Sequence, residues 1–95
     1  MPDRTAKALQ SIAANVRRIR TAKNVTQEQL AEATDLHLTY VQAIERGTRN
    51  ISVGVLLALA DALDVPVSRL LRDAKLEPPK RGRPRKRRVR RRREP

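Results

Sequence analysis

The last nineteen residues of the chain, 77–95, constrain its fold most, because they cannot form a hydrophobic core. They contain one aliphatic residue, Val89, with four prolines, 11 of the 22 Lys and Arg residues and two of the ten acidic residues. Like charges repel, and a segment with so little apolar surface cannot offset the entropy of ordering. We therefore expect a disordered basic tail, and Glu77-Pro78-Pro79 predicts a linker through which no helix continues.

The fold must then come from residues 1–76, which carry only +3 of the net charge of +12. Cysteine is absent and Tyr40 is the only aromatic residue, so we expect an aliphatic core without disulfides. With a single histidine, His37, and no clustered carboxylates, we predict no metal site, no cofactor and no enzymatic activity. The chain has neither a long apolar run nor a secretory signal, so we expect a cytoplasmic protein rather than a membrane protein.

Apolar residues recur at helical spacing through residues 6–72, and no alternating strand pattern of useful length interrupts them. A first amphipathic helix is predicted over about residues 6–22, followed by Asn24 as a left-handed cap. Its apolar face consists of Leu9, Ile12, Ala13, Val16 and Ile19.

Two short helices are predicted next, over residues 27–34 and 38–46. Thr26 is the expected N-cap of the first, and Gln29 three residues later completes a capping box. Gly47 ends the second. This is the layout of a helix-turn-helix, although periodicity alone does not separate it from other small helical bundles.

Two further helices complete an all-α fold. Ser52 is the expected cap of a fourth helix, which Pro66 separates from a short fifth helix. The apolar residues of these two helices are Leu56, Leu59, Ala60, Leu63, Leu70 and Leu71.

Three stretches of this region have a distinctive sequence: Thr26-Gln27-Glu28-Gln29-Leu30-Ala31, Ile44-Glu45-Arg46-Gly47 and Leu59-Ala60-Asp61-Ala62-Leu63-Asp64-Val65. They resemble the phage-repressor-type family, also called the lambda-repressor-like or XRE family of helix-turn-helix proteins. The resemblance covers about residues 9–71 in order and spacing. It implies a five-helix DNA-binding domain whose third helix enters the major groove while the second crosses the phosphate backbone.

The resemblance also implies roles for individual residues. Gln27 aligns with a glutamine that contacts the DNA backbone and braces the recognition helix, and Arg20 and Glu45 align with a buried ion pair. The alternative for that pair is two solvated surface charges. Base-facing candidates are Leu38, Thr39, Tyr40, Gln42 and Ala43, and phosphate-contacting candidates are Arg46, Thr48, Arg49 and Asn50.

Several positions depart from the family pattern. Leu38 and Ala43 offer a base little beyond apolar contact with a thymine methyl group, whereas Thr39 and Gln42 can donate and accept hydrogen bonds. The turn has Asp35 where glycine is usual, and His37 where serine or threonine normally caps the third helix. We therefore expect modest direct base readout and a looser start of the recognition helix.

The tail contains a second motif, which resembles an AT-hook. A glycine allows close approach to the floor of a narrow groove, a proline keeps the chain extended, and two arginines suit the negative potential of A/T-rich minor grooves. For the following segment, 85–93, phosphate binding, RNA binding and a solvated arm all remain open. The AT-hook-like residues are Lys80, Arg81, Gly82, Arg83, Pro84, Arg85 and Lys86.

These features predict two units: a DNA-binding domain over residues 1–76 and a basic tail over 77–95. We expect a nucleoid-associated transcriptional regulator that binds double-stranded, A/T-rich DNA as a homodimer, without a small-molecule ligand. One alternative is an architectural protein that coats A/T-rich DNA with little site preference. A second alternative is an antitoxin or a restriction-modification controller, because such proteins reuse this fold.

Overall fold

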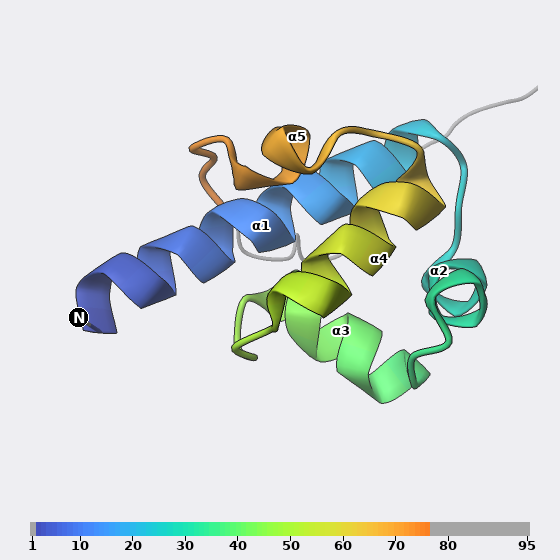
Figure 1. Cartoon of the computed structure of the whole chain (residues 1–95), viewed down its shortest axis with the longest axis horizontal. Coiled ribbons are helices and arrows are strands. Elements are labelled where there is room, and N and C mark those ends of the chain that lie inside the picture. The colour runs from blue at the N-terminus through green and yellow to red at the C-terminus, as the bar shows by residue number, and fades with distance from the viewer. Residues whose placement is uncertain (1, 77–95) are drawn as a thin grey trace, which may run out of the picture.

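The structure is a computed structural model that describes the backbone of residues 2–76 and the side chains of residues 4–76. Residues 77–95, which carry the predicted linker and the AT-hook-like motif, lie outside the described residues. Over the described range the chain is all-α, as predicted, with five helices and no strand (Figure 1). The helices are α1 (Pro2–Ala22), α2 (Gln27–Thr34), α3 (Leu38–Arg46), α4 (Val53–Leu63) and α5 (Val67–Leu71).

The long helix α1 lies along one side of the molecule, and α5 and α3 pack against it on different sides (Figure 1). Helix α4 contacts α2, α5 and α1 and thereby closes the core. Helix α3 lies at the lower edge of the view, where one of its sides is free of neighbouring helices.

The core is aliphatic, as the composition predicts. Each helix contributes to it, which explains why the domain needs neither a disulfide nor a large aromatic residue. The largest fully buried side chains are Leu30, Leu59, Leu63, Leu70, Val16 and Val41.

The predicted start of the first helix is four residues too late, because α1 begins at Pro2 rather than near residue 6. Proline suits the first position of a helix, where its missing N–H is not needed and its fixed φ is helical. The apolar periodicity, which begins at Leu9, carries no information about the turns that precede it.

The predicted helix ends agree with the structure. Asn24 takes a left-handed φ of 60°, and Gly47 ends α3 with a φ of 74°. The hydroxyl of Ser52 accepts the Val55 N–H at 3.0 Å and caps α4. No helix of the described part is long and apolar enough to cross a membrane.

Candidate nucleic-acid interface

The second helix begins with a side-chain cap. The Thr26 hydroxyl accepts the Gln29 N–H at 3.0 Å, and the Gln29 side chain accepts the Thr26 N–H at 2.9 Å, so the predicted capping box is formed. After α2, Asp35 takes a left-handed φ of 59° and turns the chain toward α3.

The start of α3 is built differently. His37 occupies the N-cap position with extended backbone, but its side chain makes no capping hydrogen bond. Leu38 and Tyr40, in the first turn, are half-buried and pack against the core. The start of α3 is therefore held by the packing of these two side chains and not by a side-chain cap.

The two sides of α3 differ in character. Val41, Ile44 and Glu45 are buried, whereas Thr39 and Arg46 are exposed and Gln42 is half-buried. Thr39, Gln42 and Arg46 are spaced three and four residues apart, so they lie on one side of the helix. That side carries hydroxyl, amide and guanidinium groups, which can bond to base edges and phosphates.

Ala43 requires a correction. It was predicted to face a base, but its side chain is only 7% exposed and belongs to the buried face of α3. Its carbonyl oxygen accepts the Thr48 N–H and the Thr48 hydroxyl, each at 3.2 Å, so Ala43 shapes the end of the helix instead.

The ion pair implied by the resemblance is formed. Arg20 on α1 donates to both carboxylate oxygens of Glu45 on α3, from Nε at 2.6 Å and from Nη2 at 3.0 Å. The same guanidinium donates from Nη1 to the Val25 carbonyl at 2.8 Å. The Glu45 side chain is 3% exposed, so the pair is shielded from water and holds α1, the following turn and α3 together.

Gln27 joins this network. Its side-chain nitrogen donates to Glu45 Oε1 at 2.9 Å, which fixes the first residue of α2 to the last turn of α3. This contact is the bracing that the resemblance implies. A polar hollow lies beside it, lined by Arg17, Arg20, Gln27, Gln42, Glu45 and Arg46. Arg17 of α1 is thereby close to α3, a proximity that sequence reasoning missed.

Tyr40 and Arg49, both predicted to contact DNA, contact each other. The Arg49 guanidinium carbon lies 4.7 Å from the centre of the Tyr40 ring, which is a cation–π geometry. Arg49 follows α3 in the chain, yet this contact brings its charge back to the first turn of the helix.

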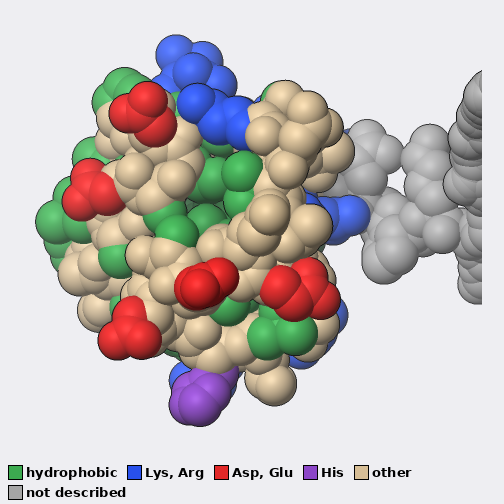
Figure 2. Space-filling view, turned by 90° about the vertical axis from the view of Figure 1, so that its right-hand side faces the viewer, with side chains coloured by type: hydrophobic (Ala, Val, Ile, Leu, Met, Phe, Trp, Pro, Cys, Tyr) green, Lys and Arg blue, Asp and Glu red, His purple; other side chains and the backbone are tan. Residues whose placement is uncertain are grey.

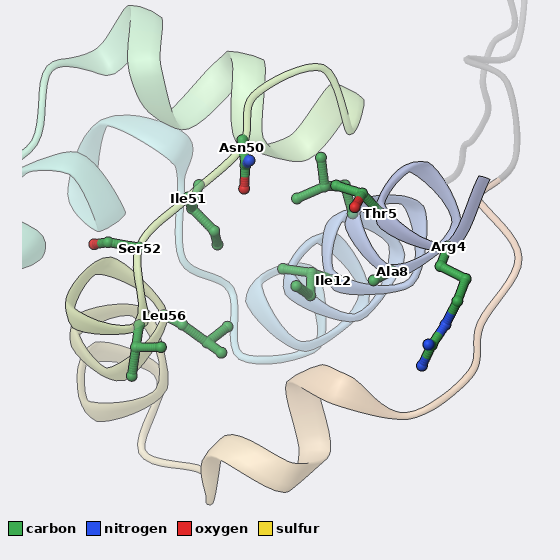
Figure 3. Close-up of a pocket in the computed structure, with 10 residues that line it drawn as sticks. Arg4, Thr5, Ala8, Ile12, Asn50, Ile51, Ser52 and Leu56 are labelled. Atoms are coloured by element: carbon green, nitrogen blue, oxygen red, sulfur yellow. The ribbon is translucent and has the colours of Figure 1, made fainter. Parts of the chain in front are cut away.

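Asn50 lies at a different place from the other predicted contacts. It lines a hollow between the start of α1 and the connection from α3 to α4, with Thr5 across from it (Figure 3). The predicted phosphate-contacting residues therefore divide between the exposed side of α3 and this neighbouring hollow.

The charge of the domain is unevenly distributed over its surface. On the face seen in Figure 2, acidic side chains are spread over the surface and basic ones lie mainly toward the edges of the view. Among the described residues, no group of three or more His, Asp or Glu side chains could hold a metal ion.

Comparison with known proteins defines the class. A family model described as "Helix-turn-helix" matches residues 16–70. The control protein C.SmaI of Serratia marcescens is 47% identical over 60 residues, which make up 63% of this chain and 71% of that protein. The control protein C.BamHI of Bacillus amyloliquefaciens is 49% identical over 57 residues, 59% of this chain and 70% of that protein.

Solved structures agree with this comparison. The restriction-modification controller protein C.AhdI from Aeromonas hydrophila has a TM-score of 0.63 at 42% identity, covering 65% of this chain and 94% of its own. The C.Esp1396I controller, solved as a tetramer on its natural 35 base-pair operator, has a TM-score of 0.60 at 29% identity, covering 68% and 96%. The chain belongs to the helix-turn-helix family, and its class is that of DNA-binding regulators.

Proposed function

We propose that this protein is a transcriptional regulator that inserts α3 into the major groove of double-stranded DNA. The observation that carries the proposal is the row of Thr39, Gln42 and Arg46 on the exposed side of α3, with Glu45 on the buried side anchoring the helix. Gln42 and Thr39 supply base contacts, and Arg46 supplies a phosphate contact. Leu38 and Tyr40 add apolar contact from the first turn.

The backbone contacts surround this row. Helix α2 begins at Gln27, where free N–H groups and the helix dipole suit a phosphate. Arg49, held over Tyr40, adds a cation beside the first turn of α3, and Asn50 adds a polar group in the hollow between α1 and the connection from α3 to α4. The domain thus offers phosphate contacts on both sides of the residues that read bases.

A homodimer fits this mode of binding. Val53, Leu57 and Leu71 are exposed to 72%, 46% and 52%, and they lie on the adjoining helices α4 and α5. Joining two copies through this apolar surface would remove it from water and present two recognition helices to two half-sites about 34–36 Å apart. Leu57→Asp should convert the dimer to a monomer in sedimentation equilibrium, and an unchanged mass would contradict this interface.

The basic tail supplies the second contact of the proposal. Its AT-hook-like motif, residues 80–86, would bind an A/T-rich minor groove, and its remaining charges would contact phosphates. Arg83→Ala should weaken binding to A/T tracts more than binding to G/C-rich duplex. Equal loss on both duplexes would reject minor-groove readout, and an unchanged salt dependence in a variant lacking residues 77–95 would reject any contact of the tail with DNA.

The relatives are control proteins of restriction-modification systems, so we propose a role in the control of such genes. A regulator of this kind would act in the cytoplasm, on the nucleoid. Genome-wide occupancy mapping tests this role directly. Sharp peaks over a palindrome near such genes are expected for a controller. Broad coverage that follows A/T content would favour the architectural alternative instead.

Gln42→Ala provides the test of the recognition helix. A side chain that bonds a base edge contributes about 1–3 kcal/mol of discrimination, so the variant should lose preference at one base position and keep its affinity for unrelated DNA. Gln29→Ala on α2 is the matched control, because that glutamine belongs to the capping box. Retained preference in Gln42→Ala would contradict the proposed reading.

A further inference from the structure

The segment after α5 is bound to α1 by hydrogen bonds over its first residues. We name residues 72–76 the C-terminal strap. Asn15 donates from Nδ2 to the carbonyls of Leu70 at 3.0 Å and Arg72 at 2.9 Å. The Ser11 hydroxyl accepts the Ala74 N–H at 3.1 Å and donates to the Ala74 carbonyl at 3.2 Å. Ser11 and Asn15, one turn apart on α1, thus bind the backbone of the end of α5 and of the strap.

Ser11 and Asn15 are buried polar residues on a helix whose neighbouring buried positions are apolar. They are 3% and 4% exposed, and a buried polar group without a partner costs about 1–3 kcal/mol. The hydrogen bonds described for the Ser11 hydroxyl and the Asn15 amide nitrogen all go to residues 70–74, while Asn15 Oδ1 accepts from Arg18 at 3.4 Å. Their role is therefore to set the path of the chain after α5.

This path ends beside the recognition helix. A methyl group placed on Gly47 would lie 3.4 Å from Leu76 Cδ2 and 3.5 Å from the Gln10 Cα atom. Gly47 directly follows Arg46, the last residue of α3. The last described residue of the chain is consequently held at the end of α3, close to the residues proposed to contact phosphate, although α5 precedes it in sequence.

We infer that the strap is a positioning device that directs the basic tail into the minor groove flanking the major groove occupied by α3 of the same protomer. This inference rests on the proposed function. It names Ser11, Asn15 and Leu76 as positioning residues, since none of them has to touch DNA. The strap would thereby fix the distance between the bases read by α3 and the A/T tract bound by the tail.

The length of chain between Leu76 and the tail arginines fits the distance between adjacent DNA grooves. Arg81 and Arg83 follow Leu76 by five and seven residues, and a chain spans at most about 3.6 Å per residue, so they can reach about 18 and 25 Å. A turn of DNA is about 34 Å, which places the flanking minor groove about 17 Å from the centre of the major groove. The next minor groove lies about 51 Å from that centre, which is about twice the distance that Arg83 can reach from Leu76. The expected spacing is about half a turn, or ~5 base pairs.

Selection of binding sites from a pool of random duplex DNA by the full-length protein tests the inference. The selected sequences should contain a base motif with an A/T tract at one fixed distance of ~5 base pairs from its centre. A full-length variant with eight Gly/Ser residues inserted between Leu76 and Glu77 should keep the motif and lose the fixed distance. Eight flexible residues add about 16 Å of root-mean-square reach, or ~5 base pairs, to the tract position.

A substitution within the domain complements the insertion. Ser11→Ala removes both strap bonds to Ala74 and should broaden the tract position without changing the motif. Thr34→Ala is the control, because the Thr34 hydroxyl bonds only to carbonyls of its own helix among the described contacts. Thermal unfolding monitors whether either variant remains folded, and the insertion leaves the domain sequence intact.

The outcomes separate the inference from the function on which it rests. A motif with an A/T tract at scattered distances in the natural sequence, or at the same distance after the insertion, would overturn the strap's positioning role and leave the tail contact standing. A motif without any A/T tract would reject the tail contact and the inference with it. A/T enrichment without a motif would reject both base reading by α3 and the fixed spacing.

Discussion

Helices α2 and α3 are similar in length and adjacent in the chain, yet they are held at opposite ends. The start of α2 is fixed by a capping box and by the bond from Gln27 to Glu45. The start of α3 has no side-chain cap, while its last turn carries Glu45 and its network. Helix α2 is thus fixed where it begins and α3 where it ends, and the first turn of α3 lacks the side-chain hydrogen bonds that hold the start of α2.

The largest expected effect comes from breaking the network between the helices. Glu45→Ala leaves the Arg20 guanidinium without its carboxylate partner and should lower the free energy of unfolding by about 3 kcal/mol. Denaturant titration measures this change. Glu32→Ala, which removes an exposed carboxylate from α2, is the control and should change stability by less than ~0.5 kcal/mol. Equal effects of the two variants would show that the network does not anchor α3.

A smaller effect is expected at the start of α2. Thr26→Ala removes the hydroxyl that accepts the Gln29 N–H and should cost about 1 kcal/mol. Thermal or denaturant unfolding measures the loss, and Thr26→Ser, which keeps the hydroxyl, should restore most of the stability. If serine fails to restore it, the cap hydrogen bond is not the source of the effect.

The smallest effect is expected at the start of α3, which lacks the side-chain cap that α2 has. His37→Ser supplies the missing cap and should raise stability by about 0.5 kcal/mol. It should also slow amide hydrogen exchange in the first turn of α3. His37→Ala, which removes the imidazole without adding a cap, separates capping from loss of the histidine. Unchanged exchange in His37→Ser would mean that the apolar contacts of Leu38 and Tyr40 already fix this turn.

The helices and their caps could be predicted because their signals are local. Thr26, Gln29, Ser52 and Gly47 each act on residues within one turn, and apolar spacing identifies the buried face of each helix. The early start of α1 escaped prediction because its first turn has no apolar periodicity. The Arg20–Glu45 pair was accessible through resemblance, since it joins residues 25 positions apart.

The rest of the candidate site depends on tertiary packing. Ala43 was placed among the base-facing residues by its position in the family resemblance, but a small side chain gives no local sign of the helix face that neighbours cover. The bonds of Ser11 and Asn15 join positions 55–63 residues apart, and no local pattern links them. The contact of Arg49 with Tyr40 depends in the same way on how the chain turns after α3.

The left-handed residues at the helix ends have a consequence for adapting this domain. Asn24, Asp35 and Asp64 hold positive φ angles of 60°, 59° and 57°, a conformation that glycine adopts most easily and that Asn and Asp adopt more readily than other residues with a Cβ. Of the described positive-φ residues, only Gly47, at the end of α3, is a glycine. Evolution or engineering can therefore adjust the thermal tolerance of the domain at three turns, without altering any side chain proposed to read DNA. At the end of α3 the left-handed residue is already a glycine.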